Sequence, residues 1–97
     1  MSAGQVWRRA DGTLWVEVQT AAIEPSGWRL MIPLYDAADA AEAPPLVITI
    51  DRWRARVHLL TGAPERTLGE ASGRLTPAQL DELREAARTL LVDPAPI

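Results

Sequence analysis

The sequence predicts a mainly β protein of the α+β class, in which five to seven short antiparallel strands precede one C-terminal α-helix. Three observations support this fold class. Apolar and polar residues alternate in short runs over the first half of the chain, turn residues separate these runs, and the apolar spacing becomes helical near the C-terminus. The length of 97 residues fits a single domain spanning residues 1–97.

The first expected strands form a hairpin. Residues 5–9 and 14–20 flank Asp11-Gly12, a pair that suits a tight turn. Within the second strand, the apolar side chains that share one face are those of Leu14, Val16 and Val18. Residues 28–34 follow as a third strand with the same alternation.

Further strands are expected after an alanine-rich, acidic connection over residues 36–45. Residues 46–50 form a β-branched run, and residues 52–60 are expected to pair with it in antiparallel fashion. Glycine and proline interrupt the next segment, which leaves room for one or two short strands through Leu68 and Leu75.

The C-terminal helix has the strongest local signals. Residues 76–79, Thr-Pro-Ala-Gln, form a capping box with proline in the first turn. The apolar residues that then recur at helical spacing are Leu80, Leu83, Ala87, Leu90 and Leu91. Residues 93–94, Asp-Pro, are expected to end the helix, because proline disfavours helical geometry in the residue before it.

Composition argues against several function classes. The chain has no cysteine and one histidine, His58, so we expect no disulfide framework, no cysteine nucleophile, no metal and no cofactor. All ten basic residues are arginine, thirteen residues are acidic, and the net charge of −3 argues against direct nucleic-acid binding. The sequence shows neither a signal peptide nor a long apolar run, which predicts a cytoplasmic protein without membrane contact.

The most distinctive pattern in the sequence consists of three arginines at a spacing of two residues. We call Arg52, Arg54 and Arg56 the arginine stripe. Their spacing of two places the three guanidinium groups on one face of a strand. Guanidinium groups bind carboxylates and phosphates in bidentate fashion, so the arginine stripe suits an acidic partner. The alternative interpretation is an ordinary strand face in contact with solvent.

Across nearly the whole chain, short motifs in a fixed order resemble the CcdB family of toxins from bacterial toxin–antitoxin pairs. The motifs are Gln5-Val6-Trp7-Arg8, Glu17-Val18-Gln19-Thr20, Arg29-Leu30-Met31-Ile32-Pro33-Leu34, Pro45-Leu46-Val47-Ile48-Thr49-Ile50-Asp51, Leu60-Thr61, Ala63-Pro64 and Leu68-Gly69. The amphipathic C-terminal helix also stands where this family has one.

The resemblance implies an SH3-like antiparallel sheet, or partly open barrel, assembled as a homodimer. It further implies a toxin that is not an enzyme, that inhibits DNA gyrase by trapping its cleaved-DNA complex, and that a cognate antitoxin neutralises. The arginine stripe is then the candidate antitoxin-binding surface. The candidate contacts with DNA gyrase, through the A subunit of that enzyme, are Leu91, Val92 and Ile97. Gyrase-poisoning members end in an aromatic or small residue, glycine and an apolar residue, whereas this chain ends in Asp-Pro-Ala-Pro-Ile over residues 93–97.

Two alternatives stay open. A MazF/Kid-like endoribonuclease toxin shares the same general fold, and its chemistry needs an acid or base beside a positive group. The candidates for those roles are Arg29, Thr49 and His58. A CcdB-fold protein that has lost its gyrase contacts would instead be non-toxic.

Overall fold

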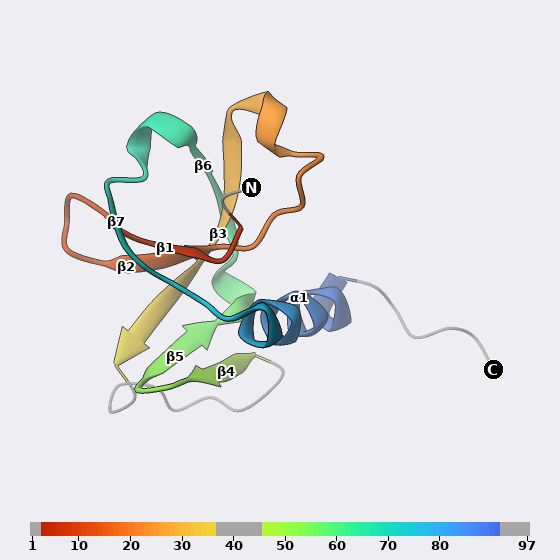
Figure 1. Ribbon diagram of the computed structural model, residues 1–97. Helices are drawn as coiled ribbons and strands as arrows, with labels where there is room; N and C mark the ends of the chain where they lie inside the picture. The colour runs from red at the N-terminus through yellow and green to blue at the C-terminus, as the bar shows by residue number, and fades with distance from the viewer. Residues whose placement is uncertain (1–2, 37–45, 92–97) are drawn as a thin grey trace.

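The computed structural model describes residues 3–36 and 46–91, and within them the chain forms one antiparallel sheet and one α-helix (Figure 1). The strands are β1 (Gln5–Arg8), β2 (Leu14–Glu17), β3 (Trp28–Asp36), β4 (Val47–Ile50), β5 (Trp53–Arg56), β6 (Thr61–Pro64) and β7 (Glu70–Arg74). The helices are η1 (Glu24–Ser26), η3 (Val57–Leu59) and η4 (Glu65–Thr67), all of the 3-10 type, and α1 (Pro77–Leu91). The predicted fold class, an SH3-like and mainly β sheet with one C-terminal helix, is confirmed.

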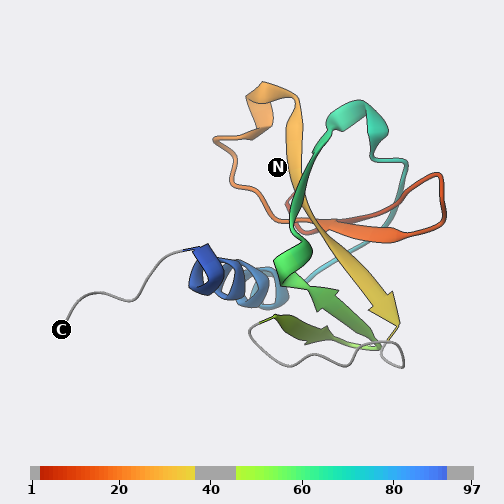
Figure 2. The same cartoon turned by 180° about the vertical axis from the view of Figure 1, so that it is seen from behind.

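Strand β3 joins the two halves of the sheet. The strand order is β4-β5-β3-β2-β1-β7, and β6 also pairs with β3. One edge of β3 pairs with β2. Its other edge pairs with β6 near its start, where Trp28 opposes Pro64, and with β5 near its end, where Asp36 opposes Trp53. Figure 2 shows β3 running from β6 at one end to β5 at the other, which curls the sheet into a partly open barrel.

Because β5 and β6 share one edge of β3, one expected strand is shorter than predicted. The sequence predicts a strand over residues 52–60, but β5 ends at Arg56 and η3 follows. Beyond that point β6 occupies the edge of β3, so the chain after β5 has no neighbour to pair with. The acidic connection, apart from Asp36, lies outside the described residues.

The main core lies between the sheet and α1. Alternation along the strands directs one set of side chains to this core, and Leu83 of α1 is fully buried against them. The strand residues concerned are Val6, Leu14, Val16, Ile32, Leu34, Ile48, Ile50 and Ala55. A second, smaller core lies on the opposite face of the sheet, where Met31, Ala63 and Leu68 pack together with Trp7 and Trp15.

Helix α1 begins as the sequence predicts. The Thr76 hydroxyl accepts a hydrogen bond from the Gln79 amide N–H at 3.2 Å, and the Gln79 side chain accepts one from the Thr76 N–H at 2.9 Å. Arg84 then ties the helix to the sheet by donating to the carbonyl oxygens of Val18 at 2.9 Å and Gln19 at 2.6 Å. The expected helix end at residues 93–94 lies outside the described residues.

A membrane-spanning helix was not expected, and the part of the chain that the structure describes contains no helix with the length and apolarity to be one.

Candidate functional site

The arginine stripe divides into two environments. Ala55 is fully buried in the main core, so its neighbours Arg54 and Arg56 project from the opposite, outer face of the sheet. Arg52 precedes β5, pairs with the carboxylate of Asp36 at 3.6 Å and lies over the Trp53 ring at 4.7 Å from its centroid. The outer face therefore carries Arg54 and Arg56, whereas Arg52 borders it.

Three polar side chains form a row across the outer face. Arg54 of β5 lies directly opposite Thr49 of β4 on one side and Tyr35 of β3 on the other. Residues that oppose each other in an antiparallel sheet point to the same face, with Cβ atoms about 5 Å apart. We call these residues the Thr49–Arg54–Tyr35 row. The Arg56 guanidinium covers one end of it, 4.4 Å from the centroid of the Tyr35 ring.

The outer face continues from this row to the β1–β2 turn. Trp15 of β2 opposes Pro33, which precedes Tyr35 by two residues on β3. The Arg9 guanidinium lies over the Trp15 ring at 5.6 Å from its centroid, and the Trp15 ring N–H donates to the Thr13 hydroxyl at 2.8 Å. The surface formed by Arg9, Trp15, Tyr35, Arg54 and Arg56 is called here the arginine–aromatic face.

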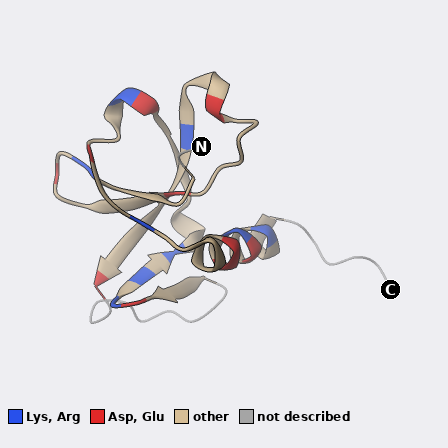
Figure 3. Cartoon of the chain, in the orientation of Figure 1, with Lys and Arg blue, Asp and Glu red and all other residues tan. Residues whose placement is uncertain are grey.

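A small cavity opens beside this face. Its volume is about 220 Å³, and its lining includes the aromatic residues Trp15, Tyr35 and Trp53 together with the charged residues Arg8 and Asp36. Aromatic walls with a few polar groups suit a flat, partly polar ligand. Figure 3 shows arginine segments on β5, at the β1–β2 turn and on η4, with acidic segments also on η4 and at that turn.

A buried polar network lies under η4, at the far end of the same sheet face. The fully buried Glu17 carboxylate accepts hydrogen bonds from the Trp7 ring N–H at 2.6 Å and the Gln19 amide at 2.7 Å. The Arg29 guanidinium lies 3.7 Å from the same carboxylate and 3.4 Å from that of Glu65. Sequence reasoning missed this network, because Glu17 and Gln19 alternate with apolar residues as solvent-facing residues do.

The candidate ribonuclease residues do not come together. Arg29 is 8% exposed in the buried network, and it stands six residues before Tyr35 on β3, a separation of about 20 Å. His58 belongs to η3 on the α1 side, where it borders a hollow with Leu90. Of these three residues, only Thr49 stands in the row with Arg54 and Tyr35.

The candidate gyrase contacts are described only in part. Leu91 ends α1 and is 74% exposed, whereas Val92 and Ile97 lie outside the described residues. The described residues also contain no group of three or more His, Cys, Asp or Glu residues placed to hold a metal ion.

Comparisons with known proteins support the fold. No protein-family model and no curated protein sequence matches the chain. An endoribonuclease from a mycobacterial species superimposes with a TM-score of 0.83 and 20% sequence identity, over 99% of this chain and 95% of that one. A mycobacterial endoribonuclease in complex with its cognate antitoxin superimposes with a TM-score of 0.82 and 20% identity, over 99% of both chains.

These likenesses correct one expectation from the sequence. This comparison contradicts the prediction that the chain is not an enzyme, because both of the solved structures described above, which share its fold over nearly its full length, are endoribonucleases. That prediction followed from the resemblance to CcdB and from the lack of a recognisable catalytic motif, and the comparisons do not single out CcdB.

Proposed function

We propose that this chain is the toxin of a toxin–antitoxin pair and that it cleaves single-stranded RNA on the arginine–aromatic face. The observation that carries the proposal is the Thr49–Arg54–Tyr35 row, with Arg56 stacked on Tyr35. The fold shared with mycobacterial endoribonucleases supports it. The proposal replaces the expectation that the chain does not bind nucleic acid. That expectation was based on the net charge of the whole chain and not on where the charged residues lie in the fold.

The chemistry proposed for the row is attack by a ribose 2′-hydroxyl on the adjacent phosphate. The bond from the 2′-oxygen to phosphorus forms and the bond from phosphorus to the 5′-oxygen breaks, which leaves a 2′,3′-cyclic phosphate and a 5′-hydroxyl. Water accepts the proton from the 2′-oxygen and supplies one to the 5′-oxygen. Negative charge develops on the two non-bridging phosphate oxygens and on the departing 5′-oxygen. In the proposed step, Arg54 donates to the two non-bridging oxygens, and the Thr49 hydroxyl, which lies opposite Arg54 in the sheet, donates to one of them.

RNA binding would use the aromatic side chains. Single-stranded RNA presents unstacked bases, which stack on aromatic rings and on guanidinium planes. The Arg56 guanidinium over the Tyr35 ring offers one such plane, and Trp15 offers a ring in the neighbouring cavity. The proposed substrate is therefore an unpaired RNA segment and not a duplex.

The antitoxin is proposed to cover the same arginines. An acidic, disordered segment that folds on binding can wrap an exposed arginine-bearing surface and pair its carboxylates with the guanidinium groups. Arg52 already pairs with a carboxylate, that of Asp36, which illustrates the kind of contact expected. An antitoxin bound there would exclude RNA. The homodimer implied by the CcdB resemblance stays a prediction.

The proposal is tested with purified protein and end-labelled single-stranded RNA. We expect cleavage that leaves 2′,3′-cyclic phosphate ends and that falls by about a hundredfold or more in Arg54→Ala, since a donor to the developing charge is lost. Arg88→Ala is the matched control, because Arg88 is an exposed arginine on α1 that pairs with Glu85 at 3.3 Å. Intact RNA, together with linear plasmid from host gyrase, would support gyrase inhibition instead.

A further inference from the structure

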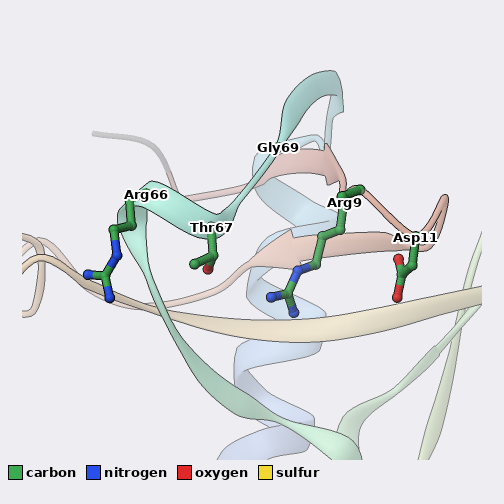
Figure 4. Close-up of a pocket in the computed structure, with 6 residues that line it drawn as sticks. Arg9, Asp11, Arg66, Thr67 and Gly69 are labelled. Atoms are coloured by element: carbon green, nitrogen blue, oxygen red, sulfur yellow. The ribbon is translucent and has the colours of Figure 1, made fainter.

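A hollow lined by two arginines lies at the other end of the arginine–aromatic face. It is open, has a volume of about 530 Å³, and is lined by Arg9, Ala10, Asp11, Arg66, Thr67 and Gly69. Figure 4 shows the side chains of Arg66, Thr67 and Arg9 extending to the same side of the β1–β2 turn and η4. Two segments far apart in the sequence thus bring two guanidinium groups to one hollow.

Gly69 makes this approach possible. Its φ of +89° is a left-handed conformation that glycine adopts without strain. A Cβ at this position would overlap the carbonyl oxygen of Arg8, so the chain after η4 passes β1 in contact with its backbone. This contact brings η4, which carries Arg66, to the end of β1 that Arg9 follows, and both arginines line the same hollow.

The guanidinium groups of the two arginines in the hollow are available to bind an anion. Arg66 is exposed and forms no ion pair with another residue that the structure describes. The Arg9 guanidinium lies over the Trp15 ring at a cation–π distance of 5.6 Å from its centroid, an interaction that does not use its N–H groups as hydrogen-bond donors. A phosphate oxygen pair matches the fork of an arginine, which is the usual basis of phosphate recognition by this residue.

Asp11 is the acidic residue of the hollow, and it is already engaged. One of its carboxylate oxygens accepts hydrogen bonds from the Thr13 N–H at 3.0 Å and the Thr13 hydroxyl at 2.6 Å. These bonds, with the charge of Arg9 as a smaller cause, lower the pKa of Asp11. The carboxylate stays ionised and helps to hold the turn, and the two arginines leave the hollow with a net positive charge.

We propose that this hollow binds a backbone phosphate of the RNA strand whose scissile phosphate lies at the Thr49–Arg54–Tyr35 row, an inference that rests on the proposed function. From the row, the route passes along β3 to Pro33, across to Trp15, and from the Trp15 ring to Arg9 at 5.6 Å from its centroid. The route is on the order of 15 Å long, so a strand must extend several nucleotides from the cleaved bond to reach the hollow. The substrate class is therefore an extended single strand and not a dinucleotide.

The test compares a dinucleotide with an RNA of about eight nucleotides, both blocked by 2′-O-methylation so that they bind without cleavage. Fluorescence anisotropy over a range of salt concentrations gives the affinity and its salt dependence. We expect Arg66→Ala and Arg9→Ala each to weaken binding of the longer RNA roughly tenfold at low salt and to lower the salt slope by about 0.7. Binding of the dinucleotide should not change in Arg66→Ala, and Arg88→Ala should match the unmodified chain with both RNAs. Asp11→Asn, which keeps an oxygen acceptor for Thr13, should tighten binding of the longer RNA.

The outcomes separate this inference from the proposed function. The phosphate site would be overturned, and the RNA-cleaving function left in place, by two results together. Arg66→Ala and the unmodified chain would have equal salt slopes, and only Arg54→Ala would lose RNA binding. A chain that binds no RNA, but whose Arg9 and Arg66 Nε–H signals shift in NMR spectra on titration with pyrophosphate, would overturn the proposed function while retaining an anion site. No shift with pyrophosphate and no effect on long RNA would overturn the inference altogether.

Discussion

The Arg56 guanidinium stacks on the Tyr35 ring, 4.4 Å from its centroid, and this contact links β5 to β3 on the outer face of the sheet. Stacking fixes the plane of a side chain that otherwise has many rotamers. It also positions Arg56 beside Arg54, which lies directly opposite Tyr35. The Tyr35 ring therefore orders the Arg56 guanidinium and lies opposite Arg54, and the proposed RNA binding uses both arginines.

Tyr35→Ala should weaken RNA binding by about tenfold or more, because base–aromatic stacking contributes about 1–3 kcal/mol and the platform under Arg56 is lost. Tyr35→Phe keeps the ring and should bind RNA as the unmodified chain does. Anisotropy with a 2′-O-methylated RNA measures both. A loss of affinity in Tyr35→Phe equal to that in Tyr35→Ala would contradict the stacking role and assign it to the hydroxyl.

Local patterns in the sequence predicted the parts of the fold that depend on local physics. The capping box formed by residues 76–79 starts α1 as expected, since the interacting groups lie three residues apart. The alternation in residues 14–20 placed Leu14, Val16 and Val18 in the core. Sequence spacing also placed Arg54 and Arg56 on one strand face. These features need no knowledge of which strands are neighbours.

The candidate site depends on pairing between distant strands, and the sequence does not specify that pairing. Thr49, Arg54 and Tyr35 form a row only because β5 lies between β4 and β3 in one particular register. A shift of one residue would direct Arg54 to the other face. The burial of Glu17 has a similar cause, because the small core under β6 and η4 covers one end of a face that alternation alone marks as exposed.

Glu17→Gln should lower the free energy of unfolding by about 3 kcal/mol, because it removes the buried counter-charge of Arg29. Glu65, which is mostly exposed, then remains as the acidic neighbour of that guanidinium. Glu85→Gln is the matched control, since Glu85 forms an exposed pair with Arg88 and should contribute at most about 0.5 kcal/mol. Urea unfolding measures both variants. Equal free energies of unfolding of the two variants would show that the buried network contributes no more to stability than a surface ion pair does.

Gly69→Ala should destabilise the protein by more than Gly12→Ala. Both glycines have a positive φ, +89° and +86°, so both substitutions carry the strain of a left-handed alanine, about 1–2 kcal/mol. Only at Gly69 does the added Cβ meet the carbonyl oxygen of Arg8, whereas nothing lies within 4 Å of a Cβ at Gly12. The difference between the melting temperatures of the two variants measures the contribution of the close approach between Gly69 and the Arg8 backbone. Equal melting temperatures would mean that the segment after η4 moves away at little cost.

Thr76→Ala should lower the free energy of unfolding by about 1 kcal/mol, because the Gln79 N–H loses its acceptor at the first turn of α1. The effect should spread to the sheet, since α1 buries Leu83 and its Arg84 binds the carbonyl oxygens of Val18 and Gln19. Thr89→Ala is the control, because Thr89 is exposed within α1 and alanine has the higher helix propensity there. Hydrogen exchange should report faster opening of the α1 amides in Thr76→Ala and unchanged or slower opening in Thr89→Ala. Unchanged exchange in Thr76→Ala would show that tertiary packing, and not the cap, sets the stability of this helix.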